Sequence, residues 1–479
     1  MVKYMKNKLV TDLENLYTLN PDFIIRELEI GTSKIYIVFL ESVASGTKVD
    51  GFILRNLSRI EEKQFNEKNI LNYISAPNLV EIKDPEEMDY YLANGFTLVI
   101  VNEMIYALET KADLFRSISE PTSEKYLDGP KDSFNENIQI NMGLIKRRIK
   151  SSDLKTEQMI IGGVSKTIVN ILYMENITDI NIVKIIKNQL EKINIDAIYD
   201  SGNIADFLAG EKKTALPTIA STERPDRVSS SLLEGKVIVL VDNSPQALIL
   251  PTFFVDFINP IGDNYIKNNN INFVKILRFF CFFLTVMIPG LYIALISYNP
   301  EILPTSLLIN FVNQNQNVPF PIFVEALIMI LICEILRESD LRFPSNYGSA
   351  ISILGALILG EAAVNSGIVS PVMIIVVAFT YITSLIFTEI VMINAIRHFR
   401  WLFLISGFFL GFYGIVLTFI YFLIHATNLD SVGYPYFYSI APFDSTYLKK
   451  TLMKKPINRD RRRSNILVKK NVTKQRSKI

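Results

Sequence analysis

Apolar residues are distributed unevenly along this chain, and the pattern changes near residue 275. Before that point charges occur throughout, and no long apolar run is present. After it, apolar stretches follow at 276–298, 320–336, 349–366, 369–396 and 401–424, and the chain ends in a segment rich in Lys and Arg. A run of about 20 apolar residues matches the roughly 30 Å hydrocarbon core of a bilayer. The pattern therefore predicts a soluble N-terminal region followed by several membrane-spanning helices.

Two β-branched and aromatic runs lie in the first part of the chain, at Lys34–Leu40 and Phe96–Asn102. Each is bounded by a turn that contains Gly, which is typical of a buried strand. A helical stretch is predicted between them, near 50–75.

A second group of elements follows after residue 158. Thr167–Met174 and Ile195–Tyr199 are strand-like, and Ile180–Ile193 between them carries apolar residues at helical spacing. This order predicts a βαβ unit and a partly parallel sheet. Further along, Lys236–Val241 and Ala247–Leu250 predict a hairpin.

These patterns predict an α/β soluble N-terminal region made of two small α/β subdomains. It is followed by an α-helical multi-span membrane domain and by a basic, disordered C-terminal tail. The predicted ranges are 1–115 and 159–270 for the subdomains, 116–158 for a connecting segment, 271–445 for the membrane domain and 446–479 for the tail.

Proline, glycine and basic residues predict the path of the membrane domain. Pro289-Gly290 should kink or break the first span, and Gly407-x-x-x-Gly411 allows close helix packing in the last. The linkers 299–319 and 365–367 lack Lys and Arg and are predicted outside, whereas the arginines at 337–342 and 397–400 place their loops inside. Five crossings would leave the basic tail outside, against this rule. Either one segment is re-entrant, or residues 431–442 dip back toward the membrane.

The charge of the tail favours the cytoplasmic side. Residues 449–479 hold 13 Lys/Arg and one acid, whereas the rest of the chain holds 36 Lys/Arg and 47 Asp/Glu. Such a run beside a membrane usually faces anionic lipid headgroups. Nucleic-acid binding is the alternative, and it is disfavoured because no aromatic residues follow Tyr447. The polar start of the chain lacks the apolar core of a signal peptide, so the soluble region is predicted to be cytoplasmic.

Two motifs in the soluble part resemble enzymatic ones. Gly162 to Thr167 resembles the end of a P-loop, but it lacks the Gly before Lys166 and the following helix that cradle a phosphate. Thr222-Glu223-Arg224-Pro225-Asp226 precedes a short helix. It is interpreted as a helix cap at Thr222 or Ser221 with a local ion pair, rather than as a catalytic pair.

Metal and redox chemistry find no support in the sequence. Cys281 and Cys333 lie in apolar stretches, where they form neither a disulfide framework nor a zinc site. His398 and His425 lie at the ends of predicted spans and have no partner cysteines. The sequence therefore predicts no enzyme, no catalytic residue, no cofactor and no metal.

Carboxylates in the apolar part are the main candidates for function. Glu325, Glu361 and Glu389 lie within predicted spans, and each costs on the order of 2–3 kcal/mol if it faces lipid. Glu334, near a span boundary, is expected to pair with Arg337 or Arg342. The candidate intramembrane polar network comprises Glu325, Glu334, Arg337 and Glu389.

One helix face could line a water-filled path. Leu354, Ile358, Glu361 and Asn365 follow one another at spacings of four, three and four, which places them on one side of a helix. Several such faces in an oligomer would favour cations. Glu361 could instead meet headgroup water at the external end of its helix.

A series of short motifs runs in order along residues 30–445. In the soluble part they include Arg116-Ser-Ile-Ser-Glu120-Pro121, Phe134-Asn-Glu136, Asn141–Lys150, Thr222-Glu223-Arg224-Pro225-Asp226 and Val241-Asp242-Asn-Ser-Pro245. In the apolar part they include Val318-Pro-Phe-Pro321, Glu334-Ile-Leu-Arg-Glu338, Ile353-Leu-Gly-Ala-Leu357, Gly367-Ile-Val-Ser370 and Val432-Gly-Tyr-Pro435. Through this series the chain resembles the A subunits of GerA-type spore germination receptors.

The resemblance implies a multi-pass protein of the spore inner membrane, with its soluble part on the spore-core side. It also implies two partners, a transporter-like B subunit thought to bind the nutrient and a C-subunit lipoprotein. The A subunit is thought to oligomerise around a pore that releases cations. The chain departs from the family pattern at Glu361, where Gln is usual, and at Phe387-Thr388-Glu389, where a Pro is usual. The Arg that usually precedes the Val318 motif is also absent.

Two functions are therefore predicted as alternatives. In the first, the chain forms a nutrient-gated homo-oligomeric channel for monovalent cations, surrounded by membrane lipids. In the second, it is an assembly subunit that organises its partners and does not conduct ions. Transport by this chain itself is disfavoured because no internal repeat of spans is visible.

Overall fold

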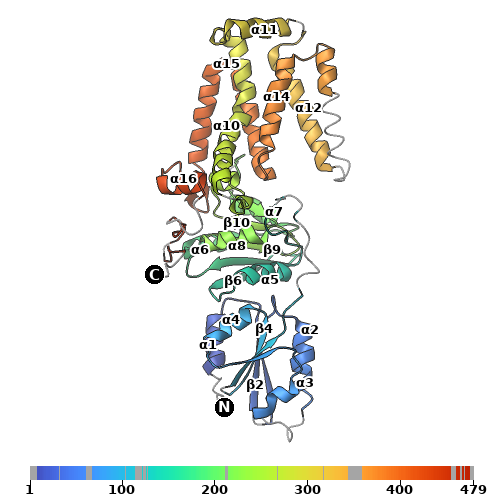
Figure 1. The fold of residues 1–479 in the computed structure, drawn as a ribbon, viewed down its shortest axis with the longest axis vertical. Coiled ribbons are helices and arrows are strands. Elements are labelled where there is room, and N and C mark those ends of the chain that lie inside the picture. The colour runs from blue at the N-terminus through green and yellow to red at the C-terminus, as the bar shows by residue number, and fades with distance from the viewer. Residues whose placement is uncertain are drawn as a thin grey trace.

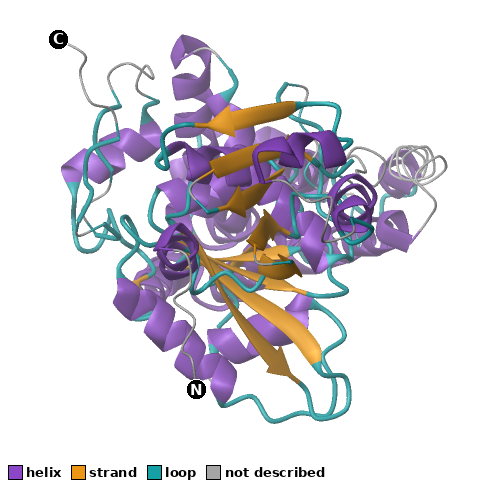
Figure 2. Ribbon diagram, turned by 90° about the horizontal axis from the view of Figure 1, so that it is seen from below, coloured by secondary structure: helices purple, strands orange, loops and turns teal. Residues whose placement is uncertain are grey.

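Three parts follow one another along the long axis of the computed structural model (Figure 1). A first sheet unit contains the N-terminus, a second sheet unit lies in the middle, and long helices form the other end. Figure 2, turned to look along this axis, shows strands enclosed by helices. The structure describes residues 8–31, 33–60, 67–102, 104–113, 121, 124, 126, 128–210, 214–266, 268–316, 318–342, 359–454, 460–463, 466–468 and 470–474.

The first unit is an antiparallel sheet in the order β1-β2-β4-β5-β3. Its strands are β1 (Phe23–Ile30), β2 (Ser33–Leu40), β3 (Leu79–Ile82), β4 (Phe96–Val101) and β5 (Met104–Glu109). Its helical segments are α1 (Lys8–Leu16), α2 (Gly46–Val49), π-helical η1 (Asp50–Leu54), α3 (Arg55–Leu57), η2 (Glu67–Tyr73) and α4 (Glu87–Ala93). The strands predicted at 34–40 and 96–102 are confirmed, and the helical stretch near 50–75 consists of several short segments.

Helices on both faces of this sheet explain its unbroken apolar runs. Along β2, Tyr36 and Val38 pack with α1 and α4, whereas Ile35 and Ile37 pack with the segments α2, η1 and α3. Successive side chains of a strand point to opposite faces, so a strand covered on both sides needs apolar residues at every position.

The second unit is also antiparallel, in the order β6-β7-β9-β10-β8. Its strands are β6 (Leu154–Ile161), β7 (Thr167–Met174), β8 (Ala220–Thr222), β9 (Val237–Val241) and β10 (Ala247–Leu250). Its helices are α5 (Ile138–Arg148), α6 (Ile180–Glu191), α7 (Ser201–Ala209), α8 (Pro225–Leu233), α9 (Phe254–Ile258) and the 3₁₀ turn η4 (Ile261–Asn264). The predicted strand at 167–174, helix at 180–193 and hairpin of β9 with β10 are confirmed.

The predicted βαβ unit and partly parallel sheet are wrong. Residues 195–199 form no strand, because their backbone bonds go to the β6–β7 turn: Gly163 N–H donates to Ile195 O at 2.9 Å and Val164 N–H to Asp196 O at 2.7 Å. β7 pairs instead with β6 and β9, both antiparallel. The connecting segment expected at 116–158 contains α5 and the start of β6, which pack into the second unit.

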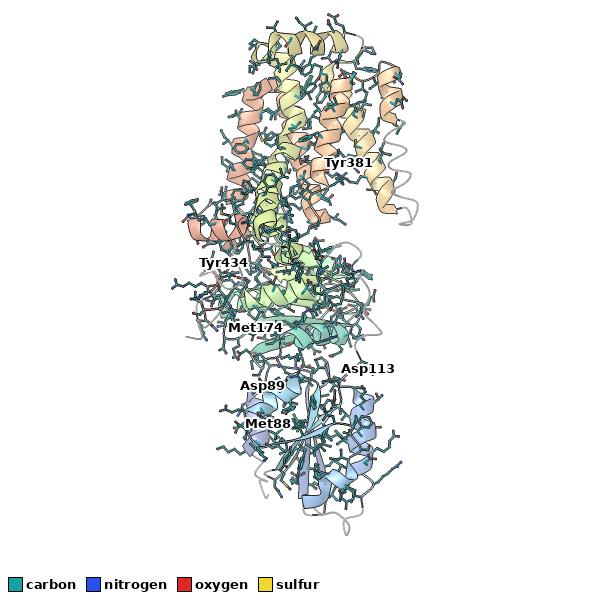
Figure 3. The ribbon with its side chains drawn as sticks, viewed as in Figure 1. Met88, Asp89, Asp113, Met174, Tyr381 and Tyr434 are labelled. Carbon is teal, nitrogen blue, oxygen red and sulfur yellow. The ribbon has the colours of Figure 1, made fainter. Side chains whose placement is uncertain are left out.

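The two sheet units meet through buried polar contacts. Lys146 of α5 donates to both carboxylate oxygens of Asp22 at 2.6 and 2.5 Å, and the side chains are 5% and 1% exposed. Ser152 Oγ donates to Asp89 at 3.1 Å across the same boundary, where Figure 3 labels Asp89. The polar pairs therefore fix how the first unit sits on the second.

The helical part departs from the five separate spans that the pattern predicts. Its elements are α10 (Asn268–Tyr298), η5 (Pro300–Ile302), α11 (Thr305–Asn315), α12 (Ile322–Arg342), α14 (Pro371–Ser384) and α15 (Ile390–Thr427). α10 continues through Pro289 without a break. The stretch 369–396 is divided between α14 and the start of α15, and no loop occurs at 397–400. Among the described residues, α10 from Ile271 and α15 are long and apolar enough to cross a bilayer, and α14 is a shorter apolar helix.

A sharp turn at Gly411 divides α15 into two antiparallel arms. Gly411 has φ 59° and ψ −142°, a left-handed conformation that favours glycine. The rings of Phe399 and Phe422 are 5.0 Å apart, although 23 residues of straight helix would separate them by about 35 Å. The second arm therefore returns toward the sheet units, as Figure 1 shows.

The C-terminal segment lies against the second sheet unit, so the prediction of a disordered tail is wrong for its described residues. The strand pair β11 (Asp430–Ser431) and β12 (Tyr434–Pro435) is followed by α16 (Ser445–Leu452). Ser431 Oγ donates to Thr218 O at 2.6 Å, and Leu467 and Val468 are 2% and 1% exposed. Burial of these two apolar residues keeps the segment against the sheet unit, although its high positive charge alone predicts disorder. Within 431–442, Tyr436 O accepts the backbone N–H of Phe254 in the sheet unit at 3.0 Å, and the ring of Phe437 lies 6.4 Å from that of Phe422 in α15.

Candidate functional site

A cluster of buried charges lies where the second sheet unit meets the helices. It comprises Glu124, Arg224, Asp226, Arg227, Tyr265 and Glu389, and we call it the junction cluster. The sequence places its centre at the start of α8, where Pro225 occupies the first helical position. Arg224 precedes this proline in an extended conformation, and it is Arg224, rather than Thr222 or Ser221, that occupies the N-cap position.

Arg224 organises the sheet side of the cluster. Its Nε and Nη2 donate to the two carboxylate oxygens of Asp226 at 3.0 and 2.8 Å, which confirms the predicted local ion pair. Its remaining N–H groups reach the carbonyls of Glu124 and Pro130 at 3.2 and 2.8 Å. The guanidinium also lies 4.7 Å from the ring centroid of Tyr126. With 1% exposure, Arg224 is a buried structural centre.

Arg227 connects this centre to the helices. Its Nη1 donates to Glu124 Oε1 at 2.9 Å, and its Nη2 donates to Glu389 Oε1 at 2.5 Å. Glu389 stands immediately before α15, in the segment that joins α14 to α15. Thr222 Oγ1 donates a hydrogen bond to the other carboxylate oxygen of Glu124, Oε2, at 2.8 Å. One guanidinium is thus shared by a carboxylate of the sheet unit and a carboxylate at the base of the helices.

The protonation of the cluster follows from burial and from its ion pairs. Burial raises the pKa of Glu389 to about 7, since the opposing attraction of Arg227 is partly offset by the nearby Glu124. Burial also acts on Asp226, but hydrogen bonds from Arg224 and Tyr265 hold its pKa below the usual value. Burial raises the pKa of Tyr126 to about 12. Ion pairs and hydrogen bonds thus connect the charged groups of the cluster.

The structure places Glu389 outside the apolar core predicted for it. The stretch 369–396 is interrupted at 385–389, on the side that faces the sheets, so Glu389 meets Arg227 and not lipid. It belongs to the junction cluster rather than to the predicted network of Glu325, Glu334 and Arg337.

Glu334 pairs with other arginines than those predicted. Its carboxylate contacts Arg400, and its Oε2 lies 2.7 Å from Arg397 Nε, both on the first arm of α15. Arg337 instead donates to Ser384 Oγ at 2.8 Å and stacks over Tyr381 at 5.0 Å, the side chain labelled in Figure 3. The positive-inside rule assigns Arg397 and Arg400 to a loop on the inner side of the membrane. In the structure they lie on one helix, where both pair with Glu334.

Glu325 lies at a different place in the helical part. It is fully buried, and its Oε2 accepts the backbone N–H of Ser370 at 2.8 Å. Ser370 is the N-cap of α14, where a carboxylate is favoured by the helix dipole. Its other oxygen, Oε1, has no hydrogen-bond partner among the described residues.

The predicted path-lining face is described only in part. Glu361 and Asn365 are exposed on a helix at 359–365, whereas Leu354 and Ile358 lie outside the described residues.

The motif residues of the soluble part do not all meet in one place. Arg116 and Glu120 lie outside the described residues, and Pro121 is buried. Glu223 accepts the backbone N–H of Glu124 at 2.9 Å and so borders the junction cluster. Asp242 lies apart from it, at the start of α5, where it accepts Ile138 N–H at 3.3 Å. The P-loop-like turn joins β6 to β7, and β7 is the strand that the sequence predicts there.

Sequence reasoning missed Arg227, Glu124 and Lys146, which carry the contacts between the three parts. Arg227 follows the Thr222–Asp226 motif directly, so its position was the only signal available. His425, predicted at a span end, hydrogen-bonds Thr214 of the sheet unit at 2.9 Å. No group of three or more His, Cys, Asp or Glu side chains within the described ranges could hold a metal ion.

The fold and the junction cluster define a class of protein in which two antiparallel sheet units follow one another and buried ion pairs join the second unit to the end of an apolar helix. The family model "Bacillus/Clostridium GerA spore germination protein" matches residues 11–466, and the chain belongs to this family. The predicted resemblance is thereby confirmed.

Two curated spore germination proteins agree with this assignment. The chain is 34% identical to spore germination protein KA of Bacillus subtilis, over 95% of this chain and 85% of that protein. It is 33% identical to spore germination protein GerLA of Bacillus cereus, over 88% of this chain and 87% of the relative. Among solved structures, it is similar to the N-terminal domain of the A subunit of the Bacillus megaterium spore germinant receptor GerK3. That match has 29% identity, covers 51% of this chain and 94% of that domain, and has a TM-score of 0.40.

Proposed function

We propose that this chain is the A subunit of a nutrient-responsive germinant receptor in the spore inner membrane. Several copies would form a path for monovalent cations, which opens when a nutrient is sensed with B-type and C-type partner subunits. The observation that carries the proposal is the bridge from Glu124 through Arg227 to Glu389, because it joins the sheet unit to the start of a long apolar helix. Movement of the sheet unit would be transmitted to α15 through this bridge.

The positions of both ends of the helical part support a multi-pass arrangement. Lys275 near the start of α10 donates to Thr451 O of α16 at 3.3 Å, and His425 at the end of α15 contacts the sheet unit. Both ends would then lie on the same side of the membrane, and the number of crossings would be even. The turn at Gly411 would supply the return that an arrangement of five spans lacks. The sheet units and the basic tail would then share the cytoplasmic side, in agreement with the charge rule.

The cation path would use the exposed face that contains Glu361 and Asn365, together with Leu354 and Ile358. Glu334 and Glu389 would not take part in this path, because each is paired with arginine within the chain. Glu361 has the exposure that a water-facing carboxylate requires, and in a ring of copies it would attract cations.

The alternative is an assembly subunit that does not conduct ions. The same ion pairs favour it, since internally compensated carboxylates stabilise a fold without any path for ions. In that case the Glu361 face would contact a partner subunit.

Ion flux distinguishes the two functions. The full chain, reconstituted in liposomes with its B-type and C-type partners, is examined for nutrient-triggered potassium efflux. Channel function predicts that Glu361→Gln lowers the preference for potassium over chloride. The matched control is Glu301→Gln, which changes another exposed carboxylate, in the separate segment η5. Unchanged selectivity of the Glu361→Gln protein would support the assembly role.

A further inference from the structure

A polar cavity of about 190 Å³ lies between the second sheet unit, the start of α10 and the C-terminal segment. Its walls come from α8, α9, η4, α10 and α16, with Leu467 of the tail closing one side. Segments more than 200 residues apart in the chain thus meet around one space. The charged side chains that line it are Arg227, Glu234, Lys236, Asp256 and Lys275.

All but one of these charges have a counter-charge. Arg227 is held by Glu124 and Glu389. Lys236 Nζ lies 2.6 Å from Asp256, and Glu234 pairs with Lys474 of the tail.

Lys275 is the exception. It is 7% exposed, and its Nζ makes one hydrogen bond, to Thr451 O at 3.3 Å. No described carboxylate lies within ion-pair distance of it. The acid on the neighbouring η4 turn, Asp263, is already bound by Arg278 at 2.9 and 3.3 Å. An ammonium group has three donors, and burial without partners is unfavourable.

A second unsatisfied group lies in the same wall. Asn259 uses its amide nitrogen to donate to Val255 O at 2.9 Å, and its buried Oδ1 has no hydrogen-bond partner among the described residues. The cavity therefore offers an unpaired cation and a neutral acceptor. This combination suits a small anion that also carries an O–H or N–H group.

We propose that this cavity binds a small oxyanion, a carboxylate or a phosphate, through the ammonium group of Lys275. Because the walls belong to the sheet unit, the helices and the tail, the bound anion would stabilise their docked arrangement. The inference does not depend on ion conduction. A protein that conducts no ions would still bind the anion.

Ligand-dependent unfolding tests the proposal. The thermal unfolding midpoint of the detergent-solubilised full chain is measured with increasing acetate, glycolate or phosphate, at constant ionic strength set with chloride. At least one oxyanion should raise the midpoint in a saturable manner, because a ligand that binds only the folded state stabilises it. Lys275→Met should weaken the apparent affinity by about 10- to 100-fold, as expected for loss of a charged hydrogen bond.

Lys155→Met is the matched control. Lys155 is 5% exposed in β6, away from the cavity, and it donates to Leu16 O at 2.5 Å. Its replacement should lower the midpoint and leave the oxyanion response intact.

A second set of unfolding measurements distinguishes a lipid phosphate from a free anion. Chain in nanodiscs of phosphatidylcholine is compared with chain in nanodiscs that also contain phosphatidylglycerol. A Lys275-dependent rise with the anionic lipid, and none with free anions, would assign the same site to a lipid phosphate. The proposal is overturned if no oxyanion source raises the midpoint. It is equally overturned if the Lys275→Met protein responds like the wild type, or if Lys155→Met abolishes the response as well.

Discussion

The crossing of α10 with the first arm of α15 depends on two glycines, and Gly407→Ala tests it. The two backbones approach so closely that a Cβ on Gly407 would lie 2.6 Å from the carbonyl oxygen of Gly290 and 3.1 Å from its carbonyl carbon. A Cβ on Gly290 would in turn overlap the carbonyl oxygen of Phe403. Because these neighbours are backbone atoms of packed helices, they cannot move aside alone.

The expected cost combines two opposing effects. Overpacking of this kind destabilises by about 1–3 kcal/mol, whereas replacing Gly by Ala within a helix favours the helix by about 0.5–1 kcal/mol. The net prediction for Gly407→Ala is a loss of about 1–2 kcal/mol. Gly360→Ala is the matched control, because a Cβ on Gly360 has nothing within 4 Å and should yield only the favourable effect.

Thermal unfolding of both variants in the same detergent provides the measurement. Gly407→Ala should unfold at a lower temperature than the wild type, and Gly360→Ala at the same or a higher temperature. Equal midpoints for the two variants would refute the close crossing and, with it, the packing of α10 against α15.

Three further predictions concern the contacts between the parts. The pKa of Glu389, raised by burial from 4.5 to about 7, means that the folded protein holds this proton more tightly than the unfolded chain. Its contribution to stability is therefore full below about pH 4.5 and is lost as the pH rises through 7, so Glu389→Gln should flatten the midpoint-against-pH curve in that window; a curve identical to the wild type would contradict this. Lys146→Met leaves Asp22 buried without a counter-charge and should destabilise the folded protein by about 3–5 kcal/mol. Much of this loss should be recovered in the double variant Asp22→Asn/Lys146→Met. Additive losses in a thermal double-mutant cycle would show that the two residues are not coupled. Leu467→Asp places a charge in the buried contact that holds the C-terminal segment against the second sheet unit. Limited digestion with trypsin should therefore cleave the chain at 461–463 faster than in the wild type. Equal cleavage rates would show that this segment is not docked through Leu467.

The amino-acid sequence determines several local elements by itself. The β-branched runs at Lys34–Leu40 and Thr167–Met174, and the helical spacing at Ile180–Ile193, are found as predicted. The ion pair of Arg224 with Asp226 could also be predicted, since these two residues are only two positions apart at the start of one helix. Local spacing is therefore sufficient to predict an ion pair when its two residues are close together in the chain.

Pairing between distant segments could not be predicted in this way. The partners of Glu334 were expected on its own helix and are Arg397 and Arg400 instead, and Glu389 meets Arg227, which is 162 residues away. Apolar periodicity measures how well a segment fits a buried environment, but it contains no information about which other segment supplies the counter-charge.

Sequence alone thus determined the division into a charged α/β region and an apolar helical region, because apolar content and its period are properties of each segment. Only the tertiary structure decided the antiparallel order of both sheets, the return of α15 at Gly411 and the docking of a basic tail. These features depend on backbone geometry and on burial of a few side chains at long range. A φ of 59° at one glycine reverses a helix that hydropathy shows as continuous, and burial of Leu467 and Val468 orders a segment whose charge indicates the opposite.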